Sequence, residues 1–170
     1  MARPSSALAG PAAIPAGAGL RLRRLLSLPE TPFAALATPC ADGQLLAGLT
    51  VGSAAIRYGI EPHRPAARRA ATHLSRVLVC DLKDARVSHD EVSLLVLGPA
   101  ARPVGAGSAP RRDVAEAPRL RVVLPWLRPG GVLLALLAPA ELTPATIKLL
   151  SARCEAATAC RLSSSAMSAL

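Results

Sequence analysis

An uncharged run of leucine, valine and alanine follows a Pro-Gly-Gly tripeptide in the last third of the chain. Pro129, Gly130 and Gly131 predict a turn, because proline fixes one backbone angle and glycine tolerates conformations that other residues resist. The uncharged run from 132 to 137, bounded by turn residues, is typical of a strand covered on both faces of a sheet. A buried helix is the alternative, since Leu and Ala favour helix. The Pro-Gly-Gly entry and the exit at Pro139 favour the strand.

Shorter apolar runs upstream alternate with segments of helical periodicity. Strands are expected at residues 33–37, 56–61, 76–81 and 92–97. Helices are expected at residues 20–28, 45–49, 62–74 and 144–154, with a weak helix or extended segment at 120–127, and a further short strand is possible at 159–162. Strand–helix alternation of this kind implies a mostly parallel sheet with helices on both faces, an α/β fold of Rossmann-like type. We therefore expect one domain over residues 20–162, with tails at 1–19 and 163–170.

The final helix has the clearest local signals. Thr143 is a good N-cap and Pro144 suits the first helical position. Ile147, Leu150 and Cys154 follow at helical spacing, so we expect them to form its buried stripe.

Composition narrows the class of protein. The 170 residues carry a formal net charge of +9, almost entirely from arginine. Affinity for nucleic acid is one interpretation, and an Arg-, Ala-, Pro- and Gly-rich coding bias is the other. The arginines are scattered in three modest groups, Arg21/Arg23/Arg24, Arg64/Arg68/Arg69 and Arg111/Arg112. The few aromatic residues offer little surface for base stacking.

Cysteine and histidine spacing does not indicate a metal site. The four cysteines form no Cys-x-x-Cys pair, and the three histidines are dispersed. We predict free thiols and a cytoplasmic location, since no signal peptide is evident. No stretch reaches the ~20 apolar residues that a membrane helix needs.

Two strand ends carry residues suited to a nucleotide-like ligand. The expected strand at 33–37 leads into a loop of small residues from Thr38 to Gln44, an arrangement that places backbone N–H groups beside a ligand. Glu61 ends the second strand, where an acid commonly holds both ribose hydroxyls. Asp81 ends the third. A solvated strand end remains the alternative for Glu61.

Five segments resemble motifs of one bacterial group of methyltransferase-like domains, and they occur in the same order. Pro39-Cys40-Ala41-Asp42-Gly43 is similar to the group's D-P-C-A-G-E-G loop, and Tyr58-Gly59-Ile60-Glu61 to its Y-G-I-E motif. Residues 73–78 resemble L-D-R-V-L, residues 93–99 resemble S-L-L-x-L-N-P-P-Y, and residues 127–131 match L-(R/K)-P-G-G. The resemblance covers residues 32–162 and implies a Rossmann-like methyltransferase fold that binds S-adenosyl-L-methionine (SAM).

The resemblance also assigns roles. The loop Pro39, Cys40, Ala41, Asp42 and Gly43 would lie against the methionine part of SAM. Glu61 would hold the ribose and Asp81 would face the adenine amino group. Gly98 and Pro99 would occupy the catalytic corner. SAM and its product S-adenosylhomocysteine (SAH) are thus the expected ligands.

The sequence departs from this pattern at the loop and at the corner. Thr38 replaces an Asp, the loop is one residue short, and Asn-Pro-Pro-Tyr is here Gly98-Pro99-Ala100-Ala101. In base-modifying relatives the Asn accepts from the target amine and the Tyr stacks on the base, and Gly98 and Ala101 can do neither. The final hairpin of the fold is also expected to be missing. An active enzyme with another acceptor, a catalytically silent relative and a basic nucleic-acid-binding module all remain open.

Overall fold

The computed structural model describes residues 17–99 and 118–159. Its centre is a sheet of five strands in the order β3-β2-β1-β4-β5, with every neighbouring pair parallel. The strands are β1 Phe33–Thr38, β2 Ala55–Ile60, β3 Arg76–Leu78, β4 Val92–Leu97 and β5 Leu127–Ala135. The strand order reverses between β1 and β4, which are neighbours in the sheet. The predicted parallel α/β fold is confirmed.

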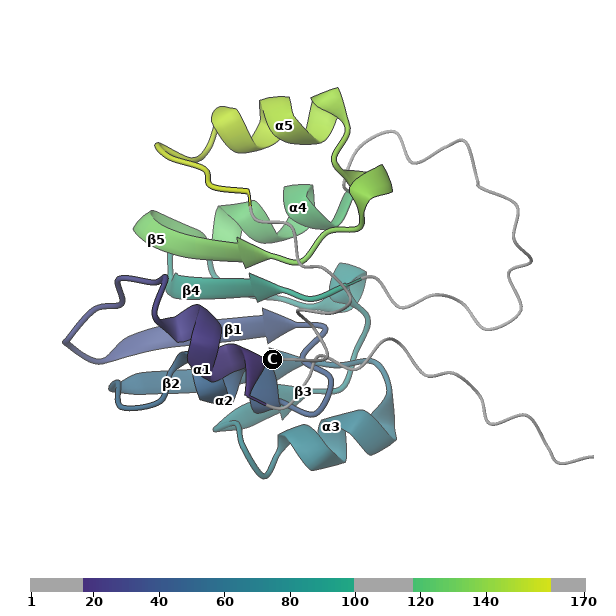
Figure 1. Cartoon of the computed structure of the whole chain (residues 1–170). Coiled ribbons are helices and arrows are strands. Elements are labelled where there is room, and N and C mark those ends of the chain that lie inside the picture. The colour runs from purple at the N-terminus through teal and green to yellow at the C-terminus, as the bar shows by residue number, and fades with distance from the viewer. Residues whose placement is uncertain (1–16, 100–117, 160–170) are drawn as a thin grey trace, which may run out of the picture.

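Helices cover both faces of this sheet (Figure 1). The α-helices are α1 Ala18–Arg23, α2 Gln44–Leu49, α3 Arg64–Ala70, α4 Pro118–Val123 and α5 Pro144–Ser151, and short 3-10 turns lie at Leu82–Asp84 (η1), Leu124–Trp126 (η2) and Pro139–Glu141 (η3). In the view of Figure 1, α1 and α2 lie in front of the sheet, α4 lies behind it, and α5 lies beyond β5. Within the described residues, no helix combines the length and hydropathy needed to cross a membrane.

The two sides of β1 and β4 face two separate hydrophobic clusters. All six residues of β4 are buried, as expected for a central strand. Successive residues point to opposite faces, so Leu94 and Val96 pack with α2, whereas Leu95 and Leu97 pack with α4. Complete burial of one such side chain stabilises the fold by about 1.5–3 kcal/mol. These central strands therefore hold the carboxyl end of the sheet in place.

Small residues allow the two helices in front of the sheet to pack closely. A Cβ atom added at Gly19 in α1 would lie 2.5 Å from the Leu45 carbonyl oxygen and 2.9 Å from the Gly48 Cα in α2. No larger side chain fits there. This packing explains why the first helix differs from the prediction: α1 begins at Ala18, inside the tail expected at 1–19, and buries Ala18 and Gly19, whereas Leu25 is 69% exposed.

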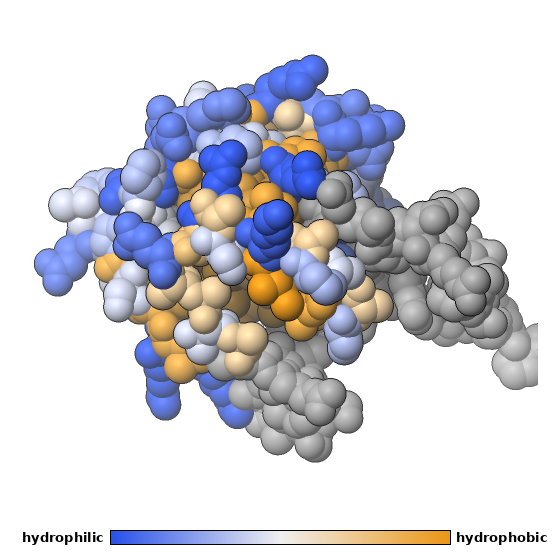
Figure 2. Space-filling model, turned by 90° about the horizontal axis from the view of Figure 1, so that it is seen from above, coloured by the Kyte–Doolittle hydropathy of each residue, from blue (hydrophilic) through white to orange (hydrophobic). Residues whose placement is uncertain are grey.

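The Pro-Gly-Gly strand is not buried on both faces, so that prediction was wrong. The tripeptide lies inside β5 rather than before it, and residues 131–137 are only half-buried. The reason is position, because β5 is at one edge of the sheet and pairs with β4 alone. Figure 2 views the molecule from the side on which α5 and β5 lie, and it shows hydrophobic residues between hydrophilic ones.

The predicted start of the last helix was correct, and its predicted buried stripe was right at Leu150 but wrong at Ile147, while Cys154 lies beyond the end of α5 at Ser151. Thr143 caps α5 by accepting a hydrogen bond from the Thr146 N–H at 3.2 Å. Ile147 is 54% exposed, whereas Thr146 is buried and Leu149 and Leu150 pack against the core. Residues rotate by about 100° along a helix, so a shift of one position changes the buried face.

The third strand is shorter than expected. It ends at Leu78 rather than at Asp81, and Val79 is half exposed. Asp81 therefore lies in the connection beyond the strand, directly before η1. The possible strand at 159–162 and most of the loop at 98–119 lie outside the described residues.

Candidate cofactor site at the carboxyl end of the sheet

The strand tips that carry the predicted site residues are joined to one another by backbone hydrogen bonds. Cys40 N–H donates to the Ile60 carbonyl at 3.0 Å, which joins the loop after β1 to the end of β2. Gly98 N–H donates to the Thr38 carbonyl at 3.0 Å, which joins the end of β4 to the same loop. The structure thus brings together three of the four regions predicted from sequence, at the point where strand order reverses. Ligands of open α/β sheets bind in this position.

Glu61 is the most tightly held polar side chain of this group. It is only 5% exposed. Its Oε2 accepts from the Ala41 N–H at 2.9 Å, and its Oε1 accepts from the His63 N–H at 3.0 Å. The carboxylate therefore links the loop after β1 to the segment that leads into α3. Sequence placed Glu61 at a strand tip but gave no indication of these two backbone partners.

The loop from Pro39 to Gly43 is a compact turn that leads into α2. Gly43 N–H donates to the Cys40 carbonyl at 2.8 Å, and Asp42 Oδ1 accepts from the Gln44 N–H at 3.1 Å. Gly43 has a left-handed backbone (φ 81°), and an added Cβ would lie 3.2 Å from the Ala70 Cα. Glycine is therefore required at the end of this loop.

Cys40 is a packing residue in this loop rather than a nucleophile. Burial, reinforced by the nearby Glu61 carboxylate, raises the pKa of its thiol to about 12. A Cβ atom added at Gly59 would lie 2.6 Å from Cys40 Sγ, so the thiol occupies the space above that glycine. Cys40, Cys80 and Cys154 form no disulfide within the described part of the chain.

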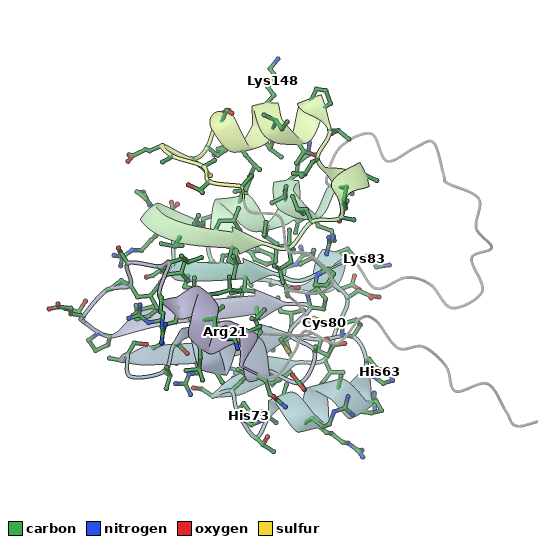
Figure 3. The ribbon with its side chains drawn as sticks, viewed as in Figure 1. Arg21, His63, His73, Cys80, Lys83 and Lys148 are labelled. Atoms are coloured by element: carbon green, nitrogen blue, oxygen red, sulfur yellow. The ribbon has the colours of Figure 1, made fainter. Side chains whose placement is uncertain are left out.

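Asp81 is exposed and sits at the end of the sheet toward which the strands point. It makes no capping bond to η1. Burial, followed by the charges of Asp84 and Asp81, raises the pKa of the neighbouring Cys80 thiol. Figure 3 shows Cys80 and Lys83 on this side, with His63 and His73 near opposite ends of α3. No group of three possible metal ligands occurs among residues 17–99 and 118–159.

The corner at Gly98 is closed by the loop after β1. A Cβ atom added at Gly98 would lie 2.8 Å from the Pro39 carbonyl oxygen, so no side chain fits at this position without moving the loop. Pro99 follows, half-buried. The corner is therefore built from backbone groups in place of the Asn side chain of the resembling motif.

Two residues that sequence reasoning missed support this corner. Arg119 Nη1 donates to the Gly98 carbonyl at 2.7 Å, and Arg119 Nη2 pairs with Glu141 Oε1 at 2.8 Å. Glu141 Oε2 in turn accepts from the Ala138 N–H at 2.7 Å. The only available signal was that Glu141 is the first acid after the uncharged run.

A cavity of about 540 Å³ lies elsewhere, between residues 83–89 and the side chains of Val122 and Trp126. It is lined by none of the residues predicted for the cofactor site.

Comparison with known proteins identifies the family. A model of the uncharacterised methyltransferase family DUF6094 matches residues 13–168. The chain belongs to this methyltransferase family. No curated protein sequence matches it.

Solved structures agree on the fold. A Methanococcus maripaludis protein assigned as a SAM-dependent methyltransferase matches with a TM-score of 0.52 at 10% identity, over 80% of this chain and 62% of that one. A complex of the Haloferax volcanii Trm112 methyltransferase activator with a methyltransferase matches with a TM-score of 0.51 at 15% identity, over 70% of this chain and 50% of that one. A TehB-like SAM-dependent methyltransferase from Corynebacterium glutamicum matches with a TM-score of 0.50 at 16% identity, over 79% of this chain and 70% of that one. The chain thus spans between half and two thirds of the first two of these structures.

Proposed function

We propose that this DUF6094 chain binds SAM and SAH at the carboxyl ends of β1, β2 and β3, as a SAM-dependent methyltransferase whose acceptor is unknown. One observation carries the proposal. Glu61 lies at the tip of β2, and its carboxylate is fixed by backbone N–H groups from the loops on either side. A fixed acid at this strand tip can receive both hydroxyls of a ribose.

The residues present fit such a ligand chemically. A carboxylate has about four acceptor sites, and the two backbone bonds use one on each oxygen of Glu61. A further acceptor site on each oxygen suits the ribose hydroxyls. Asp81 is exposed and suits the adenine amino group as a second acceptor. Bound SAM would supply an electrophilic methyl group beside the loop at residues 39–43.

The corner at Gly98 suits methyl transfer that depends on alignment of the acceptor atom with the methyl group. It offers no side chain that could accept a hydrogen bond from a substrate amine. Gly98 has no side chain, and its carbonyl already accepts from Arg119. Transfer from SAM depends mainly on holding the acceptor atom in line with the methyl group, which does not require a particular catalytic side chain. The amine-orienting chemistry of the Asn-containing motif does not apply to this corner.

A catalytically silent SAM- or nucleotide-binding role is the second candidate. It is favoured by the Pro39 carbonyl, whose oxygen lies 2.8 Å from the position that a Cβ atom at residue 98 would take. A nucleic-acid partner has weaker support, from Arg64, Arg68 and Arg69 on the exposed side of α3. Binding of that kind would weaken steeply with added salt.

Calorimetric titration with SAM and, separately, SAH tests the proposal. Glu61→Gln and Asp81→Asn each convert a carboxylate into an amide of similar size, and Glu155→Gln is the control at an exposed acid. Loss of a hydrogen bond to a charged group costs about 1.5–3 kcal/mol, so we expect each site variant to bind about 10- to 100-fold more weakly. Asp81→Asn is the cleaner variant, because Asp81 is exposed and folding should not depend on it.

The outcomes separate the candidates. Micromolar binding that is weakened in both site variants and unchanged in Glu155→Gln supports the cofactor site. Absence of binding of either ligand to the native chain would refute it. Tight binding with no methyl transfer to amine, oxygen, nitrogen-heterocycle or thiol acceptors would favour the silent role.

A further inference from the structure

We propose that Arg119 is a positioning residue that couples the corner at Gly98 to the loop at residues 38–43. The inference rests on the proposed function, because it assigns to Arg119 a part in SAM binding. Arg119 is in none of the five motifs. It comes from α4, on the other side of the sheet from α2.

The Gly98 peptide is held at both ends. Its N–H donates to the Thr38 carbonyl at 3.0 Å, and its carbonyl accepts from Arg119 Nη1 at 2.7 Å. The Pro39 carbonyl packs against its Cα, where no Cβ would fit. Gly98 therefore cannot move without also moving Thr38 and Pro39, which begin the proposed cofactor loop. Arg119 fixes the Gly98 end of that connection.

Arg119 is itself fixed by an acid. Its Nη2 pairs with Glu141 Oε1 at 2.8 Å. The two side chains are 20% and 17% exposed, so solvent screens this pair less than a surface pair. Glu141 Oε2 accepts from the Ala138 N–H, three residues after the end of β5. The guanidinium thus bridges Gly98, which follows β4, and the η3 turn that follows β5.

The bridge needs the planar fork of arginine. Two terminal nitrogens reach two different acceptors, Gly98 O and Glu141 Oε1, in one rigid geometry. A lysine ammonium is a compact charge on a flexible stem and reproduces this geometry poorly. Lysine at position 119 should therefore keep part of the interaction, whereas methionine removes both hydrogen bonds while keeping similar bulk.

Titration of SAM into the full chain and its variants tests the coupling. We expect Arg119→Met to bind SAM at least 10-fold more weakly than the native chain. The SAM affinities of Arg119→Lys and Glu141→Gln should lie between those of Arg119→Met and the native chain. Arg128→Met removes an exposed arginine from β5 and should leave the affinity unchanged. Thermal unfolding of each variant shows whether it remains folded at the temperature of the titration.

A second readout separates positioning from general stability. Hydrogen exchange of the Gly98 amide, measured by NMR, should be faster in Arg119→Met than in the native chain. Amides at the amino end of β4 should keep their native exchange rates. Native-like SAM affinity in Arg119→Met would overturn the inference, as would exchange that accelerates equally throughout β4. If the native chain binds no SAM, the proposed function fails as well. If it binds and Arg119→Met binds equally well, the coupling alone fails.

Discussion

Replacing Gly98 by alanine should both destabilise the chain and weaken SAM binding. The added Cβ would lie 2.8 Å from the Pro39 carbonyl oxygen, well inside the 3.4 Å at which ordinary contact begins. Both atoms belong to the backbone or are fixed directly to it, so no change of rotamer relieves the overlap. Overpacking of this kind costs about 1–3 kcal/mol. Alanine also restricts the unfolded chain, which offsets about 0.4–1 kcal/mol of the loss.

The net loss, about 1–2 kcal/mol at the middle of these two ranges, is measurable by urea unfolding. With a slope of about 1–3 kcal/mol per molar urea, the midpoint should fall by roughly 0.3–2 M at unchanged slope. SAM affinity should fall in the same variant, because the Pro39 carbonyl must move and Pro39 begins the proposed cofactor loop. Gly52→Ala is the matched control: Gly52 has a left-handed φ of 69° with nothing within 4 Å of an added Cβ. It should lose stability through backbone strain and keep its SAM affinity.

Gly98→Asn extends the test, because it restores the residue of the resembling motif. We expect it to lose at least as much stability as Gly98→Ala and to gain no affinity. Stability of Gly98→Ala within 0.5 kcal/mol of the native chain would show that the loop does not close on this corner. A gain of methyl transfer to amines in Gly98→Asn would refute the reasoning outright.

Three further predictions concern the surroundings of the site. Gly59→Ala places a Cβ 2.6 Å from Cys40 Sγ and should cost about 1–3 kcal/mol in urea unfolding, with partial rescue in the Gly59→Ala/Cys40→Ala double variant. The raised pKa of Cys40, from 9.0 to about 12, means that only the unfolded thiol ionises between these values. The free energy of unfolding should therefore fall with rising pH above 9, by up to about 1.4 kcal/mol per pH unit more than in Cys40→Ala; equal slopes would contradict the burial of the thiol. Thr143→Ala should lower stability by about 1 kcal/mol in thermal unfolding and Thr143→Ser should not, whereas equal losses would show that the capping hydroxyl contributes nothing.

The sequence predicted the strands where local signals and burial agree. The strands β1 and β4 are apolar runs bounded by turn residues, and a central place in a parallel sheet requires that pattern. The failure at β5 has a physical cause. An uncharged run of leucines indicates burial, but sheet order depends on contacts between distant segments. The run around Leu133 is as apolar as β4, so its composition could not show that this strand lies at the edge of the sheet.

The sequence predicted where the residues of the candidate site lie along the strands, but not which groups they contact. Glu61 and the loop at 39–43 follow strand ends, and parallel strands place such ends side by side. The bond from Ala41 to the Glu61 carboxylate depends on loop geometry that no spacing encodes. The pairing of Arg119 with Glu141 spans 22 positions, and one arginine among many gives no sign of which acid it contacts. Buried polar partners of this kind are the part of a site that requires the structure.

Two departures from the resembling motif can now be related to one another. A Cβ atom at position 98 would lie 2.8 Å from the Pro39 carbonyl oxygen, so glycine is the residue that this loop permits. We infer that the loss of the Asn and the change of the loop belong together. On this proposal the change affects the corner at Gly98 and leaves in place Glu61 and Asp81, the acids proposed to hold SAM. The proposal makes SAM binding separable from methyl transfer to an amine, and measuring SAM affinity tests the part assigned to the two acids.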